Sequence, residues 1–165
     1  MHATRKLWTW LAVICVLSFA VLGWVGTEIY LTAPPIPKQV ISSDGTVLFS
    51  EGQVQNGQQA WLSAGGQQLG SVWGHGSYVA PDWSADWLHR EALALRAVWA
   101  EHQFGKPFEL LGAGQQAELN DRLRSEMRRN TYDANTGTIT LSTERAEAVQ
   151  KVANHYTSLF GDDPS

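Results

Sequence analysis

Residues 7–27 of the chain, LWTWLAVICVLSFAVLGWVGT, contain no charged side chain and decide how the protein is organised. As an α-helix this stretch is about 31 Å long, which matches the hydrocarbon thickness of a lipid bilayer. Tryptophans stand near both of its ends, at Trp8 and Trp24, where amphipathic rings favour the membrane interface. The sequence therefore predicts one N-terminal transmembrane helix.

The charges that flank this helix predict its orientation. Arg5 and Lys6 precede it and Glu28 follows it. Because basic flanks stay in the cytoplasm, we expect a cytoplasmic N-terminus in the inner (plasma) membrane and a periplasmic or extracellular remainder. A cleaved signal peptide competes with this interpretation, but the run is longer than a signal-peptide core and no small-x-small cleavage site follows. A buried core helix is the weaker alternative, since long core helices rarely lack charge on every face.

The remainder of the chain has room for one domain of ordinary size. We expect residues 1–31 to form the cytoplasmic N-terminus and the anchor. The proline-rich stretch 32–38 then leaves the membrane in an extended form, because its prolines cannot continue a helix. The exported domain is expected at 39–165. The formal net charge is -4 and no basic block follows the N-terminus, so nucleic acid is not an expected partner.

Turn and helix signals predict that the exported domain is mainly α with small β-hairpins. Asp44-Gly45 is the favoured pair for a two-residue type I′ turn, and Asp82 and Ser142 are placed to cap helices. How the two hairpins pair with the rest of the domain is left open. The expected elements are a hairpin at 38–50, a helix at 51–64, an ordered glycine-rich loop at 70–81, helices at 83–104 and 113–129, a hairpin at 130–141 and a final helix after residue 142.

Haem is the first cofactor to consider, because many cytochromes c are helical exported domains on a single anchor. Covalent attachment needs C-x-x-C-H, and the one cysteine, Cys15, lies inside the predicted membrane helix. Noncovalent haem would need an axial ligand, and no spacing singles out a pair among His75, His89, His102 and His155. The histidines and acidic residues match no recurring metal or triad pattern. We expect no catalytic, cofactor or metal site in this chain.

The segment WGHGSYVAPDWSADWLHRE, residues 73–91, combines three tryptophans, two histidines and four charged residues. One interpretation is a tryptophan-rich core segment followed by the start of an amphipathic helix. The functional interpretation is a surface that docks on a larger membrane partner, which would also supply partners for the charges. The predicted docking surface comprises Trp73, His75, Tyr78, Trp83, Asp86, Trp87, His89, Arg90 and Glu91.

Three motifs carry a family resemblance: GQQAW at 57–61, GSVWGHGSYVAPDWSADWLHREA at 70–92 and NTYDANTGTITLS at 130–142. With the anchor and the PPIP exit, they resemble the N-terminal region of the large subunit of the quinol-dependent nitric oxide reductases. In that family the region is similar to the small cytochrome c subunit of the two-subunit reductases, without its haem motif. The resemblance implies a cytochrome-c-like helical domain lacking haem.

The resemblance also implies where the chemistry of the parent enzyme lies. In that family two haems b and a non-haem iron occupy a following multi-helix membrane portion, which converts two NO to N2O in denitrification or NO detoxification. The chain stops at Ser165, before those helices, so no catalytic or haem-ligand residue of the family has a counterpart here. The implied role is structural or docking, with the catalytic membrane portion as partner. The alternative is a free-standing membrane-anchored assembly or sensor protein that reuses this domain.

Overall fold

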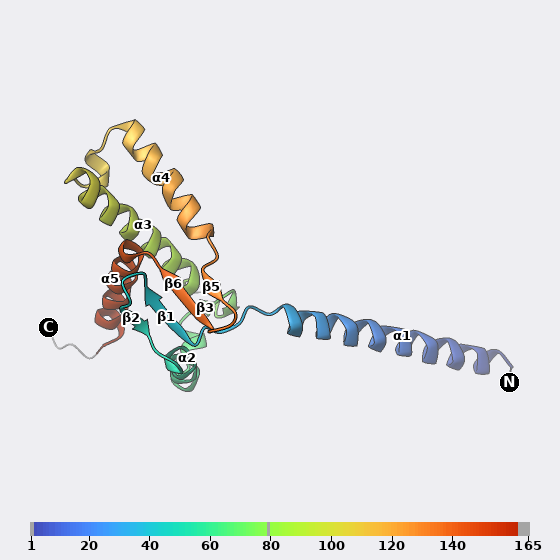
Figure 1. Ribbon diagram of the computed structural model, residues 1–165. Coiled ribbons are helices and arrows are strands. Elements are labelled where there is room, and N and C mark those ends of the chain that lie inside the picture. The colour runs from blue at the N-terminus through green and yellow to red at the C-terminus, as the bar shows by residue number, and fades with distance from the viewer. Residues whose placement is uncertain (1, 79, 162–165) are drawn as a thin grey trace. The chain divides into compact units, whose positions relative to one another are not determined.

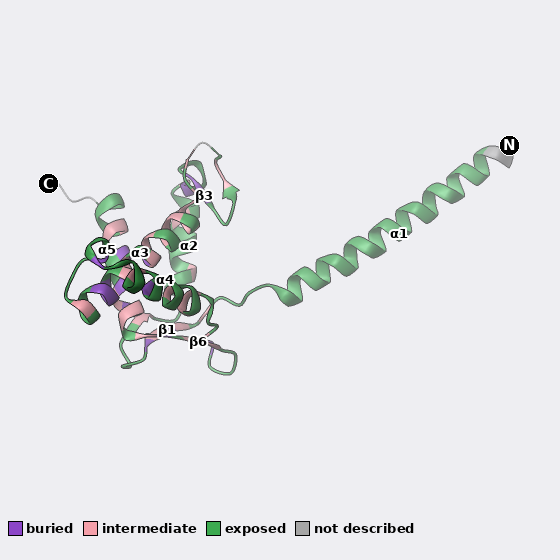
Figure 2. Cartoon of the chain, turned by 90° about the horizontal axis from the view of Figure 1, so that it is seen from above, coloured by how far each residue is buried: buried purple, intermediate pink, exposed green. Residues whose placement is uncertain are grey.

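The charge-free stretch forms the middle of helix α1 (His2–Thr32), which belongs to the first of two units of the chain, Met1–Pro35. The computed structural model describes residues 2–78 and 80–161. Within that part, α1 is the one helix that is long and apolar enough to cross a membrane, over Thr4–Thr32. None of that span is buried, as the uniformly exposed α1 in Figure 2 shows.

The second unit, Ile36–Ser165, confirms the prediction of a mainly helical domain with small β-structures (Figure 1). The ordered loop predicted at 70–81 contains two very short strands, and Val79 lies outside the described residues. In chain order the elements are β1 (Gln39–Ser42), β2 (Val47–Phe49), α2 (Gln53–Ser63), the 3-10 turn η1 (Gly66–Gln68), β3 (Ser71–Val72), β4 (His75–Gly76), α3 (Trp83–Phe104), the 3-10 turn η2 (Phe108–Leu110), α4 (Ala113–Arg128), β5 (Tyr132–Asp133), β6 (Thr138–Leu141) and α5 (Thr143–Phe160).

The two predicted hairpins join into one sheet. In the described part of the chain its strand order is β2-β1-β6-β5. Each hairpin is antiparallel, whereas β1 and β6 pair in parallel, with Val40 opposite Ile139. The buried side chains of Val40, Leu141 and Val149 form a small core where this sheet meets α5. The sheet therefore ties the beginning of the domain to its last helix.

The turn between β1 and β2 differs from the predicted two-residue type I′ turn. That turn needs positive φ at both central residues, but here Gly45 has φ +90° and Asp44 does not have positive φ. The N–H of Gly45 donates to the carbonyl of Ser42 at 2.9 Å, and the Asp44 carboxylate accepts from the N–H of Thr46 at 2.9 Å. This side-chain bond supports a three-residue loop in which glycine alone takes the left-handed conformation.

The predicted cap of α3 is confirmed, and that of α5 is only partly right. Asp82 Oδ1 accepts a hydrogen bond from the N–H of Ala85 at 3.0 Å, as an N-cap should. Ser142 occupies the N-cap position of α5, but its side chain caps nothing. Its hydroxyl instead donates to Glu126 Oε1 at 2.9 Å, because α4 places that carboxylate within reach. Ser142 thus connects two helices.

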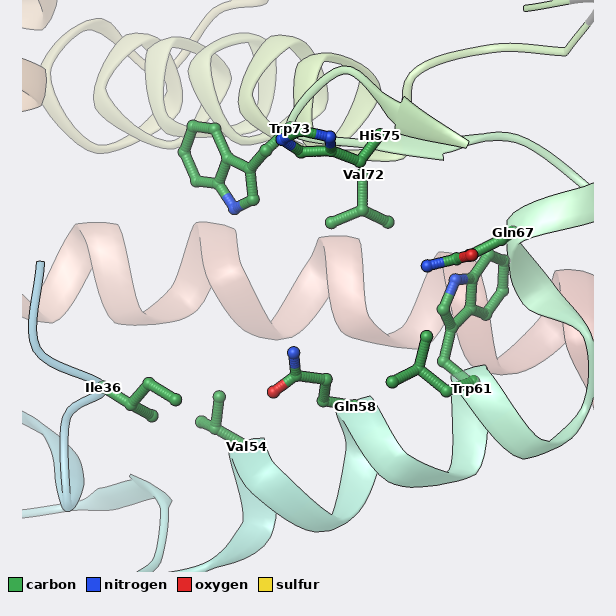
Figure 3. A pocket seen from close by; sticks show the side chains of 9 residues that line it. Ile36, Val54, Gln58, Trp61, Gln67, Val72, Trp73 and His75 are labelled. Atoms are coloured by element: carbon green, nitrogen blue, oxygen red, sulfur yellow. The ribbon is translucent and has the colours of Figure 1, made fainter. Parts of the chain in front are cut away.

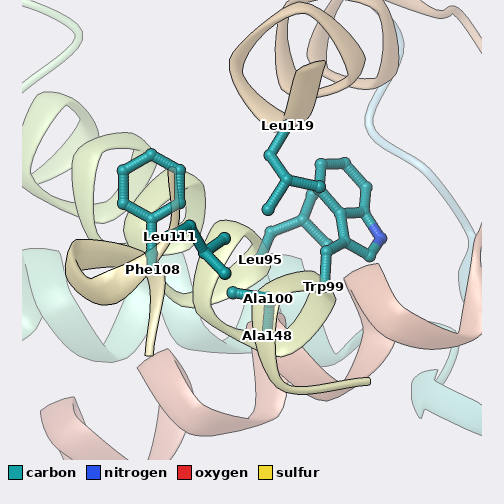
Figure 4. Packing of buried hydrophobic residues seen from close by; sticks show 7 residues of the cluster. All are labelled: Leu95, Trp99, Ala100, Phe108, Leu111, Leu119 and Ala148. Carbon is teal, nitrogen blue, oxygen red and sulfur yellow. The ribbon is translucent and has the colours of Figure 1, made fainter. Parts of the chain in front are cut away.

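The main core lies where α3 packs against α4 and α5 (Figure 4). Leu95 and Trp99 of α3 are buried, and Leu119 of α4 lies against the Trp99 ring. The guanidinium of Arg122 covers that ring, with 4.2 Å from Cζ to the ring centroid. Helix α4 is therefore a surface helix, attached through a narrow apolar line that begins at Leu119.

Candidate docking surface

The predicted docking residues divide into two groups, and the first group binds α3 to α5. Asp86 Oδ2 accepts hydrogen bonds from Arg90 Nε at 2.7 Å and from the Tyr156 hydroxyl at 2.6 Å. The Arg90 guanidinium and the Tyr156 hydroxyl hold the pKa of Asp86 below its usual value. Burial of the phenol and its bond to Asp86 raise the pKa of Tyr156 to about 12. Asp86 therefore has its partners within the domain.

Glu91 was predicted to belong to the docking surface, but it is only 3% exposed and therefore does not lie on the surface. Its carboxylate accepts from Trp87 Nε1 at 3.1 Å and from Arg145 Nε at 2.7 Å. We expected Asp86 and Glu91 to find partners in another polypeptide region, but α3 and α5 of this domain supply them. Removing one partner of such a buried pair costs about 3–5 kcal/mol, since the other charge stays buried.

The tryptophans at the start of α3 are half-buried and pack against aromatic side chains of α2 and α5. Trp83 meets Trp61, Tyr156 and Phe160 edge to face, with ring centroids 5.4–6.4 Å apart. Trp87 stacks on Tyr156 at 5.5 Å. Tyr156 and Phe160 are four residues apart and share one face of a helix, but no local pattern connects them with Trp61 or with the predicted docking surface. The helical spacing of α5 predicts which of its residues share a face, but not which residues that face contacts.

The second group of predicted residues is exposed. Trp73 is 76% exposed and Tyr78 is 95% exposed, and His75 and His89 also lie at the surface. His89 is on α3, whereas the other three belong to the β3–β4 hairpin or the loop that follows it. The exposed part of the predicted docking surface therefore lies mainly on the β3–β4 hairpin and the loop after it.

Asp82 holds this hairpin on the first turn of α3. Besides capping the helix, its carboxylate accepts from the Ser71 hydroxyl at 2.6 Å and from the N–H of Gly74 at 2.8 Å. These donors, with the N–H of Ala85, lower the pKa of Asp82 to about 2. The N–H of Trp73 donates to Ser84 Oγ at 3.0 Å. The hairpin is thus fixed by hydrogen bonds to α3.

Trp73 adopts an unusual backbone conformation at the tip of the hairpin. Its φ is +53°, in the left-handed region that large side chains rarely occupy, and Gly74 follows with φ +75°. Strain of this kind costs about 1–3 kcal/mol and persists where surrounding bonds hold it, often at functional positions. The bonds to Ser84 and Asp82 provide that support here. The backbone that carries the exposed indole is therefore fixed to α3 rather than part of a free loop.

A groove of about 570 Å³ lies between α2 and the hairpin (Figure 3). The α2 side chains point toward the hairpin, and Val72 points back toward α2. The sequence analysis did not identify α2 as one side of this groove, because a few apolar residues on a short helix resemble an ordinary core face. The lining residues are Ile36, Val54, Gln58, Trp61, Leu62, Gln67, Val72, Trp73 and His75.

The groove does not fit a haem. His75 is the one described lining residue that could ligate iron, and the described lining includes no lysine or arginine to pair with haem propionates. His102 lies 3.6 Å from a Glu147 carboxylate oxygen, and His155 lies against Tyr156, so neither joins His75. Cys15 lies in α1, in the other unit of the chain. Among the described residues, no three His, Cys, Asp or Glu side chains gather in a way that could hold a metal.

Comparison with known proteins agrees with the resemblance found in the three sequence motifs. A family model for the cytochrome c-like domain of NorB, a subunit of nitric oxide reductase, matches residues 37–165. The match begins one residue after the start of the second unit, Ile36–Ser165, and so covers that unit almost completely. A search of curated proteins gave no match for the chain.

The Asp86–Tyr156 bond generates a prediction about alkaline stability. Since the folded pKa of Tyr156 is raised to about 12, its contribution is complete below pH 10 and is lost as the pH rises toward 12. Tyr156→Phe keeps the ring that stacks on Trp87 but removes the hydroxyl, and should lower the free energy of unfolding by about 2 kcal/mol at neutral pH. Tyrosinate absorbance at 295 nm should show one residue ionising near pH 12 in the parent chain and none there in the variant. An unchanged titration would contradict this assignment.

Proposed function

Because the chain belongs to the family of NorB cytochrome c-like domains of nitric oxide reductase, we propose that it is the membrane-anchored, haem-free N-terminal domain of a quinol-dependent reductase. Its role is to dock on the catalytic membrane portion, which carries haem b and non-haem iron and converts NO to N2O. The family match over 37–165 is the observation that carries the proposal. The exposed apolar groove and hairpin are consistent with a domain that has a partner.

The anchor is the first element of this proposal. Helix α1 is long and apolar enough to span a bilayer, and Trp8 and Trp24 suit its two interfaces. Arg5 and Lys6 lie before the span, which favours a cytoplasmic N-terminus and an exported domain.

Orientation can be measured with reporters fused after Ser165. Alkaline phosphatase, which folds only outside the cytoplasm, should be active there, while green fluorescent protein at the same position should be dark after export through the general secretion route. Replacing Arg5 and Lys6 by glutamate is the matched control and should reduce the phosphatase signal, because the basic flank sets the topology. A fluorescent fusion and inactive phosphatase in the parent chain would reverse the proposed orientation.

The haem-free state is the second element. The groove offers His75 alone as an iron ligand and no cation for the propionates, and C-x-x-C-H does not occur in the sequence. We therefore expect haemin titrated into the purified chain to give no stoichiometric Soret band. His75→Ala serves as the control. A band that forms in the parent chain and disappears in His75→Ala would show that the groove binds haem after all.

Docking is tested in the full reductase that contains this domain. Specific protease sites are placed in the exit segment before Ile36 and directly after Ser165, and the assembled enzyme is cleaved at both. The released domain should stay with the catalytic portion through size-exclusion chromatography in detergent, because non-covalent contacts hold it there. The chain alone with the exit site is the control, and its domain should separate from the anchor. Complete separation from the catalytic portion would contradict a docking role.

A further inference from the structure

We propose that the groove face, formed by α2 and the β3–β4 hairpin, is the surface that meets the catalytic membrane portion, with Trp73 as its anchor. The partner surface is an uncharged, apolar surface of polypeptide. This inference rests on the proposed docking role and names the side of the domain that performs it. It replaces the wider surface expected from residues 73–91, because Asp86 and Glu91 are engaged inside the domain.

The charge distribution separates this face from the rest of the domain. From Gly52 to Pro81 the sequence contains no aspartate, glutamate, lysine or arginine, although the chain has 28 such residues, 12 basic and 16 acidic. The same stretch exposes Val54, Leu62 and Trp73 around the groove. The centres of protein interfaces are depleted in charge, and exposed apolar patches with polar rims mark such interfaces. A surface without charge suits a partner surface without charge, because it leaves no ion unpaired when water is excluded.

The α4 face and the Arg90 side of α3 have the composition of solvent-exposed surface. Helix α4 carries six charged residues among its 16, and several of them form ion pairs, such as Arg124 with Asp121. On α3, Arg90 is paired with Asp86. The charged side chains on these faces are already hydrated or ion-paired. Burying them against a partner would therefore stabilise a complex less than burying the groove face would.

The hairpin adds a preorganised anchor to this face. Trp73 is exposed although its backbone is held in a left-handed conformation by hydrogen bonds to Ser84 and, through Gly74, to Asp82. Tryptophan is among the residues that dominate interface energies, and a hairpin backbone that is fixed before binding loses less entropy when its surface is buried. A strained position that exposes a large indole is consistent with a contact outside the domain.

The composition favours polypeptide over lipid as the occupant. A surface that docks on anionic headgroups uses lysine and arginine, and the stretch 52–81 has neither. It has six glutamines instead, at positions 53, 55, 58, 59, 67 and 68. Their amides both donate and accept hydrogen bonds, which matches backbone and side-chain groups of a protein partner.

A matched pair of substitutions tests the face in the doubly cleavable reductase. Leu62→Glu places a charge in the groove, and Leu110→Glu places the same charge on η2, away from it; the two leucines are 49% and 71% exposed, so neither change disturbs the core. After cleavage, Leu62→Glu and Trp73→Ala should each raise the dissociation constant of the domain about tenfold or more, while Leu110→Glu leaves it unchanged. Circular dichroism of each domain checks that the fold is intact.

Photo-crosslinking identifies the occupant directly. A benzophenone amino acid at Leu62 should crosslink to peptides of the catalytic portion, whereas the same group at Leu110 should not. Crosslinks from Leu62 to lipid alone would overturn the partner class. If the parent domain stays bound after cleavage but Leu62→Glu and Trp73→Ala bind equally well, the docking role holds and the groove face is wrong. If the parent domain itself separates, the docking role fails first.

Discussion

The buried carboxylate of Glu91 is the constraint on which the domain depends. A charge at 3% exposure must be compensated inside the protein, and Trp87 Nε1 and Arg145 Nε do so from α3 and α5. The Arg145 bond crosses from α5 to α3, whereas the Trp87 bond lies within α3 and orients an indole that stacks on Tyr156 of α5. Glu91 therefore helps to set the register of the two helices. The hydrogen bonds of Asp86 with Arg90 and Tyr156 lie one turn earlier on α3 and reinforce the same contact.

This contact also determines where the aromatic residues lie. With α3 held on α5, Trp83 meets Tyr156 and Phe160, and Trp61 of α2 completes the cluster. Gly66 is needed directly after α2, because a Cβ atom there would come within 2.2 Å of the Trp61 ring. Helix α2 has no buried residue and is attached largely through this ring. Its remaining apolar side chains are therefore left facing the groove.

Local sequence signals predicted the elements well, because caps, glycines and apolar periodicity act within a few residues. Asp82 as the cap of α3 and the two hairpins were found in this way. The parallel pairing of β1 with β6 joins residues about a hundred positions apart, and no local pattern specifies it. The prediction of a type I′ turn at Asp44-Gly45 was wrong, because the Asp44 carboxylate supports a different loop.

The burial of individual residues within the predicted docking surface could not be predicted, for the same reason. Charge and aromatic content mark residues 73–91 as unusual, yet only the long-range partners on α5 decide which of them face inward. Arg145 and Tyr156 lie 54 and 70 residues from the acids that they bind. Asp82 then links the two halves of the segment: it caps α3, whose position Glu91 fixes, and holds the hairpin that carries Trp73. The backbone that carries the exposed indole is thus fixed to the same helix that Glu91 holds on α5.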